Sequence, residues 1–281
     1  MTVTTKKKVA PQKMRPINHP LKRASEIVPQ TAEHRNADHL PSANTEQASL
    51  SPDDPDFRWK MMSKKEALRP ELRKYLDRGT YLGPTLRHPL LTYHGVDETR
   101  AAWINWCIDY KQKEMEKCRK DGNWFAVLAG YSTPFLTEGF VNEQEHFDDE
   151  VYWKALSEVW TMQESHWRNR TVILHLFQSS RPKRHELMRR PEHLAFAELP
   201  DTLTLYRGYI GRKGKGLSWT TQKETAVMFA TRFASIEHLG KPRIVSGVAK
   251  KSDVLAFFTR REEADVVIAP DNVIRKKRSL L

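Results

Sequence analysis

The order of apolar and polar residues divides the chain into three stretches. Residues 1–56 are rich in proline, serine, threonine, asparagine and charge, and they show no sustained periodicity. Such a composition is typical of a disordered or partner-dependent arm. From residue 57 to about residue 200, apolar positions recur mainly with the period of helices. Beyond Pro200 the pattern changes to short alternating runs, which predict strands.

Two segments of the middle stretch carry clear helical periodicity. The first begins near Asp97, which is a suitable N-cap. Its apolar stripe consists of Trp103, Trp106, Cys107 and Tyr110. The second begins with acidic residues, which suit the positive end of a helix. Tyr152, Leu156, Val159 and Gln163 share one of its faces, flanked by Trp153 and Trp160. At this spacing we expect the tryptophans in the core rather than stacked on nucleic-acid bases.

Five runs after Pro200 predict strands: TLTLYRGY and LSWT, which alternate, and the short runs RIVSGVAK, DVLAFFT and DVVIAP. In LSWT the alternation sends Ser218 and Thr220 to one side, and Leu217 and Trp219 to the other. The last three runs are separated by brief polar turns, which are too short for crossover helices. We therefore expect a mostly antiparallel sheet.

One helix is predicted between these strands. Thr221 and Glu224 have the spacing of a capping box. Ala226, Phe229 and Ala230 then share one face, whose small residues allow close packing on a sheet. The chain as a whole is thus predicted to be α+β: an arm (1–56), a helical region (57–200), and a C-terminal sheet domain with a basic tail (201–281).

Charge and composition narrow the function classes. The net charge of +12 and the pI near 9.6 favour nonspecific attraction to nucleic acid or acidic surfaces. Part of the excess positive charge lies in Lys6–Lys8 and Arg275–Arg278, which we interpret as solvated tails. No apolar run of eighteen residues exists, so no membrane span is expected. The basic start lacks the apolar stretch of a secretory signal, so we expect the protein to lie in the cytoplasm.

Cysteine and histidine usage predicts neither a disulfide nor a metal site. Cys107 and Cys118 are eleven residues apart on one predicted helix, too far along the axis to be bridged. The eleven histidines lack metal-ligand spacing.

The glycine-rich loop GRKGKGLS has the residues of a phosphate-binding loop but not its spacing, and it leads into an extended segment. We interpret Arg212, Lys213 and Lys215 as a flexible basic connector.

Four short motifs occur in order along the C-terminal domain: YRG on the first strand, SWT on the next, the small-residue helix ETAVMFATRF, and EADVVIAP, in which acidic residues lead into an apolar strand. In this order they resemble the arginine–serine–glutamate class of mono-ADP-ribosyltransferases, which includes bacterial toxins and bacteriophage enzymes. The resemblance covers roughly residues 200–274. It implies an NAD-binding domain of the ADP-ribosyltransferase type, on which the helical region packs.

The resemblance implies a role for each matching residue. Arg207 would contact the NAD phosphates through its forked guanidinium, beside Tyr206 and with Gly208 allowing close approach of the backbone. Ser218 would bond near the nicotinamide ribose and Thr220 would brace the site. Trp219 takes the place of the family's middle threonine, and Phe229 would help to wall the nicotinamide pocket.

The last motif departs from the family pattern. EADVVIAP aligns Glu263 with the position near the acceptor and Asp265 with the catalytic glutamate. Period-two geometry would send both side chains to one face. The family's carboxylate bonds the ribose and stabilises the oxocarbenium formed as nicotinamide leaves. An aspartate is shorter by about 1.5 Å, so either the strand is shifted or Glu263 supplies the carboxylate.

The resemblance implies transfer of ADP-ribose from NAD, as substrate, to a macromolecular acceptor, with nicotinamide released and no metal required. A protein side chain is the expected acceptor, and Glu263 favours arginine over asparagine. Two alternatives stay open. One is NAD hydrolysis without an acceptor. The other is a binding module of the same fold, without turnover, acting on nucleic acid or a protein partner, which the basic charge and the missing glutamate favour.

Overall fold

The computed structural model describes residues 55–79, 83–211, 214–237 and 240–280. The predicted arm therefore lies almost entirely outside the described residues, as do Arg212 and Lys213 of the basic connector. The helices are α1 (Pro55–Met62), α2 (Ala101–Lys120), α3 (Trp124–Ala129), α4 (Leu136–Glu143), α5 (Asp149–Met162), α6 (Arg170–Phe177), α7 (Arg190–Ala197) and α8 (Lys223–Glu237). The strands are β1 (Leu76–Asp77), β2 (Thr85–His88), β3 (Leu91–Tyr93), β4 (Thr202–Ile210), β5 (Ser218–Thr220), β6 (Pro242–Lys250), β7 (Val254–Phe258), β8 (Asp265–Ile268) and β9 (Ile274–Leu280).

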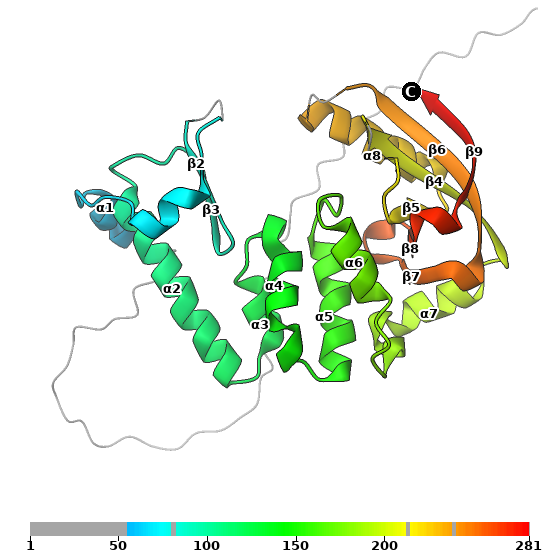
Figure 1. The fold of residues 1–281 in the computed structure, drawn as a ribbon, viewed down its shortest axis with the longest axis horizontal. Coiled ribbons are helices and arrows are strands. Elements are labelled where there is room, and N and C mark those ends of the chain that lie inside the picture. Colours follow the sequence, from blue (N-terminus) through cyan, green and yellow to red (C-terminus); the bar gives the residue numbers. More distant parts are fainter. Residues whose placement is uncertain (1–54, 80–82, 212–213, 238–239, 281) are drawn as a thin grey trace, which may run out of the picture. The chain divides into compact units, whose positions relative to one another are not determined.

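The C-terminal part is a six-stranded sheet in the order β7-β8-β5-β4-β6-β9 (Figure 1). All of its pairings are antiparallel, which confirms the α+β class and the antiparallel sheet. One expectation was wrong: the basic segment at Arg275–Arg278 is not a tail but lies within β9, which pairs with β6 at the edge of the sheet. The first residues of β9 include too few apolar side chains to show the apolar–polar alternation that predicts a strand.

Helix α8 packs on one face of the sheet against β4 and β6 (Figure 1). Ala226 and Ala230 are buried in this contact, as the spacing predicts. A Cβ at Gly208 would lie 1.9 Å from the carbonyl oxygen of Ala226, so only glycine allows β4 to approach the helix backbone this closely. The helix begins at Lys223, and Thr220 rather than Thr221 accepts from the backbone N–H of Gln222, so the predicted capping box is absent from this turn.

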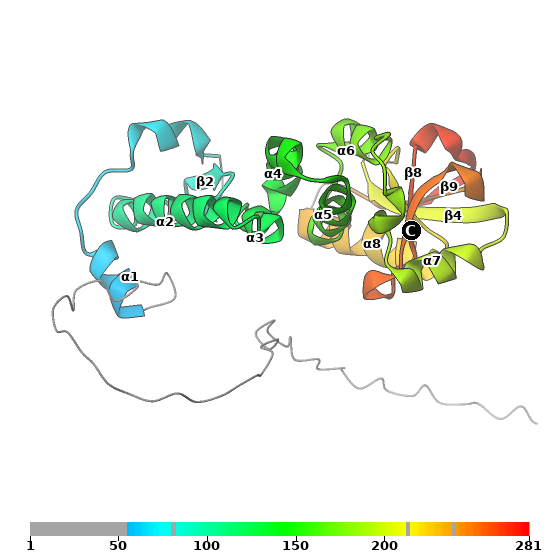
Figure 2. The same cartoon turned by 90° about the horizontal axis from the view of Figure 1, so that it is seen from below.

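The middle region is helical, with a small sheet that the periodicity did not predict. Helices α2 to α5 follow one another in space, each packing on the next (Figures 1 and 2). Strands β1–β3 form an antiparallel sheet of their own, and strands of two to four residues are too short to show a period. Asp97 does not cap α2 but accepts from the N–H groups of Thr99 and Arg100 in the preceding turn. The apolar run TVILHLF is helical and lies in α6.

A shared apolar core joins the helical region to the C-terminal sheet. It includes Leu156 and Trp160 of α5, Phe177 of α6, Phe258 of β7 and Val267 of β8, all buried. The expected packing on the sheet domain is therefore confirmed for α5 and α6. No helix in the described part of the chain is long and apolar enough to span a membrane.

Candidate functional site

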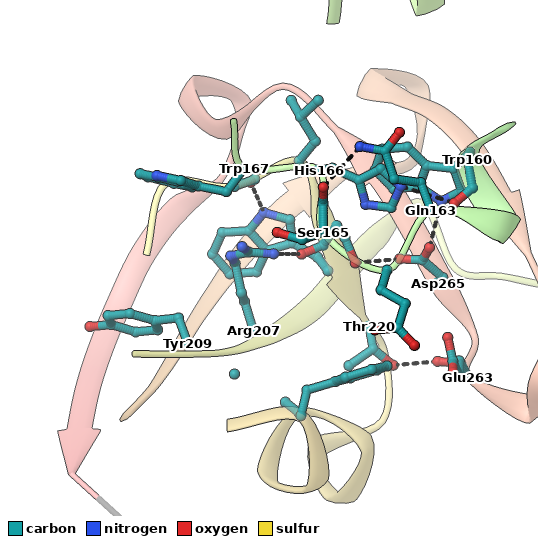
Figure 3. Close-up of a pocket in the computed structure, with 18 of the residues that line it drawn as sticks. Trp160, Gln163, Ser165, His166, Trp167, Arg207, Tyr209, Thr220, Glu263 and Asp265 are labelled. Atoms are coloured by element: carbon teal, nitrogen blue, oxygen red, sulfur yellow. Dashed lines mark hydrogen bonds between the residues drawn. The ribbon is translucent and has the colours of Figure 1, made fainter. Parts of the chain in front are cut away.

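A pocket lies where the end of α5 meets the middle of the sheet (Figure 3). Its floor is formed by β4, β5 and the start of β8, and α8 contributes one wall. The opposite wall is the end of α5 together with the segment Gln163–Trp167 that follows it. All nine residues that the sequence singled out line this pocket: Tyr206, Arg207, Gly208, Ser218, Trp219, Thr220, Phe229, Glu263 and Asp265.

The pocket opens where two neighbouring strands diverge. Strands β4 and β5 pair only at Tyr206 and Thr220, and Arg207 is the next residue of β4. Its guanidinium Nη1 donates to the carbonyl oxygen of Ser218, at 2.5 Å. A Cβ at Gly216 would lie 2.1 Å from Nη2 of Arg207, so this glycine makes room for the guanidinium. Burial lowers the pKa of Arg207 to about 10, which leaves it a cation at neutral pH.

Asp265 is held from two sides at the start of β8. The hydroxyl of Ser218 donates to its Oδ1 at 2.7 Å, and the indole Nε1 of Trp160 donates to its Oδ2 at 2.7 Å (Figure 3). Burial raises the pKa of Asp265, while the hydrogen bonds from Ser218 and Trp160 and the charge of Arg207 oppose this rise. The carboxylate is thus fixed in orientation and faces a guanidinium within the pocket.

Glu263 reaches the same pocket by a different backbone route from the one the alternation predicts. Strand β8 begins only at Asp265. Glu263 directly follows the 3₁₀ turn Arg260–Glu262, and Ala264 between the two carboxylates has φ of 44°, so period two does not apply there. The two acidic side chains nevertheless both line the pocket. Burial raises the pKa of Glu263, and the nearby charge of Asp265 raises it further.

The turn that carries Glu263 is tied down on both sides. The Thr220 hydroxyl donates to the carbonyl oxygen of Glu263 at 2.9 Å. Arg261, at φ of 65°, donates to the carbonyl oxygen of Thr161 at the end of α5. Arg260 adds an ion pair with the buried Glu192, at 3.1 Å. Neither arginine was singled out from the sequence, because their partners lie about 70 to 100 residues away along the chain.

Strand β5 separates the pocket from the core. Trp219 is 1% exposed, and its indole donates to the carbonyl oxygen of Gly216, within the cluster on the far side of the sheet from Ser218. Its side chain therefore stabilises the loop before β5 and is not free to contact a ligand. Leu217 precedes the strand and joins the cluster that contains Val267, so the predicted alternation holds only from Ser218 onwards.

The segment after α5 carries site residues that the sequence did not reveal. His166 stacks on the indole of Trp160, with ring centroids 3.8 Å apart and an angle of 13° between the planes. Its Nε2–H donates to the carbonyl oxygen of Trp160 at 2.9 Å. Burial lowers the pKa of His166 to about 4, so the ring is neutral at pH 7. Trp167 and Arg170 lie at the pocket, with the guanidinium 4.3 Å from the indole centroid.

The pocket therefore has two chemically distinct ends. Figure 3 shows Trp167 and Tyr209 towards one side, Asp265 and Glu263 towards the other, and Arg207 between them. Two carboxylates whose pKa values are raised can stabilise a developing cation and accept a proton. A guanidinium between an aromatic and an acidic end suits a ligand with a phosphate group in its middle. Among the described residues, no three His, Cys, Asp or Glu side chains are arranged to hold a metal ion.

Comparison with known proteins adds no family to this geometry. No protein-family model, no curated protein sequence and no solved structure matches the chain. What the pocket does must therefore be inferred from its own residues.

Proposed function

We propose that the protein is an NAD-dependent mono-ADP-ribosyltransferase, which moves ADP-ribose from NAD to a macromolecular acceptor, a protein side chain in the first instance. The observation that carries the proposal is the meeting of Arg207, Ser218, Glu263 and Asp265 in one pocket. These residues come from separate motifs spread over 59 positions. Arg207, Ser218 and Glu263 match the residue types of the ADP-ribosyltransferase motifs that the sequence resembles, and Asp265 supplies a carboxylate where that family has a glutamate.

The two ends of the pocket fit the two ends of NAD. Arg207 lies between them, where its fork pairs with the pyrophosphate oxygens. Asp265 and Ser218 then face the ribose that carries nicotinamide, and Phe229 borders the same space from α8. The aromatic side chains at the other end offer flat apolar surface to the adenine.

The chemistry follows from the position of Asp265. The bond between the ribose carbon and the nicotinamide nitrogen breaks, both electrons leave with neutral nicotinamide, and the ribose becomes an oxocarbenium ion. The ionised carboxylate of Asp265 stabilises that positive charge, and it is pre-oriented by its two hydrogen bonds. The acceptor then donates a lone pair to the same carbon.

Glu263 is the base that receives the acceptor's proton. Burial raises the pKa of Glu263 towards neutral pH, and a carboxylate with a raised pKa is a stronger general base than one with an ordinary pKa. When no acceptor enters, water takes its place and the product is free ADP-ribose. The same residues thus support NAD hydrolysis as a side reaction.

Labelled NAD tests the proposal. The protein is incubated with NAD carrying a tag on its adenine and with a bacterial lysate, and the tagged proteins are detected after denaturation. The proposal predicts tagged proteins with the wild type and none with Arg207→Ala. Nicotinamide release without tagged protein would assign NAD hydrolysis instead. Absence of both, together with salt-sensitive binding to DNA, would favour a binding module without turnover.

A further inference from the structure

Trp160 is a hydrogen-bond donor to Asp265 that comes from outside the sheet. It lies on the last turn of α5, 105 residues before Asp265, and its Nε1–H reaches the carboxylate oxygen Oδ2 at 2.7 Å (Figure 3). Ser218, the other donor, comes from the neighbouring strand. Because each donor takes a different oxygen, the plane of the carboxylate is set by the helical region and the sheet together.

The indole itself is rigidly placed. Trp160 is 3% exposed. The His166 ring stacks on one side of the indole and donates a hydrogen bond to the Trp160 carbonyl oxygen. The Phe177 ring contacts the indole edge-on, with the ring centroids 5.3 Å apart. A side chain packed in this way has no alternative rotamer to relax into, so the position of its N–H is fixed before any ligand binds.

We propose that Trp160 is a positioning residue for Asp265, which holds the short aspartate carboxylate where the reaction requires a negative charge. The inference rests on the proposed function and deepens it. A hydrogen bond from a neutral N–H favours the ionised form of a carboxylate and fixes its direction without neutralising it. The helical region is then part of the catalytic apparatus, not only a support for the sheet.

Other charged groups face Asp265 as well. Arg207 from β4 and Arg261 from the turn before β8 favour its ionised form, whereas Glu263 is a like charge close to it. All three remain in a variant that removes only the indole N–H. A change in the ionisation of Asp265 in that variant therefore reports on Trp160.

The test compares two variants of the same type. Trp160→Phe keeps an aromatic ring in the core and removes the N–H. The control, Trp153→Phe, lies two turns earlier on α5, is fully buried, and loses an indole hydrogen bond to the Pro182 carbonyl. Trp160→Phe should lower kcat for nicotinamide release about 10- to 100-fold, with little change in KM, whereas the control keeps wild-type kcat. Equal kcat in the two variants would overturn the inference.

The pH profile separates positioning from a structural effect. Losing the Trp160 donor raises the pKa of Asp265, so the acidic limb of the kcat profile should move to higher pH in Trp160→Phe and stay in place in Trp153→Phe. If Trp160→Phe does not fold, a benzothiophene analogue of tryptophan at position 160 keeps the two-ring shape and lacks the N–H.

A measurement without turnover distinguishes the two proposals. Carboxyl-carbon NMR titration follows Asp265 directly in the full chain. A wild type that never releases nicotinamide would refute the proposed function, and the titration would still test Trp160. An Asp265 that titrates at the same pH with and without the indole N–H would overturn the positioning role.

Discussion

Acidification should destabilise the fold through one ring, His166. Burial is the main cause that lowers its pKa from 6.5 to about 4, and the charges of Arg207 and Arg261 add to the effect. Since the folded-state pKa lies below the unfolded value, His166 stabilises the fold above about pH 6.5, and this contribution is lost as the pH falls towards 4. Asp265 and Glu263 act in the opposite sense, because their raised pKa values favour the fold at low pH.

The size of the effect follows from the shift. One pKa unit corresponds to about 1.4 kcal/mol, so the whole contribution of His166 is on the order of 3 kcal/mol. At pH 5 the unfolded ring is almost fully protonated and the folded ring is still mostly neutral. By linkage, about 2 kcal/mol of the free energy of unfolding is then already lost between pH 7.5 and pH 5.

Urea denaturation of the wild type and two variants isolates the contribution of His166 to the free energy of unfolding. His166→Gln removes the titrating ring and keeps an N–H donor for the Trp160 carbonyl, while His175→Gln changes an exposed ring on α6. The stability advantage of the wild type over His166→Gln should shrink by about 2 kcal/mol between pH 7.5 and pH 5, whereas His175→Gln follows the wild type. An advantage that stays constant over this range would refute the placement of His166 as a half-buried, neutral ring.

Three substitutions test the packing around the pocket. Gly208→Ala places a methyl 1.9 Å from the Ala226 carbonyl, which cannot move within α8, so thermal unfolding should show a loss of about 3 kcal/mol or more. Gly216→Ala displaces the guanidinium of Arg207; calorimetry should show NAD affinity lowered about tenfold, and unchanged affinity would contradict this contact. Arg260→Met leaves a buried carboxylate unpaired and should cost about 3–5 kcal/mol in urea denaturation.

Local patterns predicted the elements of the site well. The alternation around Ser218 and Thr220 and the small residues of α8 are features of neighbouring positions, and each corresponds to an observed strand or helix contact. Gly208 was expected to let the backbone come close to NAD, whereas in the structure it lets β4 approach the backbone of α8. Asp265 was singled out through the resemblance of EADVVIAP to the family's last motif, and it is the first residue of β8. Periodicity of 2 or 3.6 residues reports on one element at a time, so it predicts such features directly.

Contacts between distant segments could not be predicted in the same way. Trp160 has the helical spacing of a core residue, and it is one, but nothing near it in the chain indicates that its N–H meets Asp265. His166 lies in a short connector without periodicity. The turn at Ala264 shows a further limit, because a positive φ at alanine results from the tertiary ties of Arg261 and Thr220, not from local preference.

Nicotinamide release by Asp265→Asn tests the central claim most directly. An asparagine can keep both contacts, with its oxygen accepting from Trp160 and its amide donating to the Ser218 hydroxyl, so the variant should fold with unchanged or higher stability at pH 7. The matched control is Asp271→Asn, which neutralises an exposed carboxylate away from the pocket.

The proposed function predicts that the wild type and Asp271→Asn release nicotinamide from NAD at the same rate, and that Asp265→Asn is slower by about 10²-fold or more. Folded Asp265→Asn that releases nicotinamide at the wild-type rate would contradict the account.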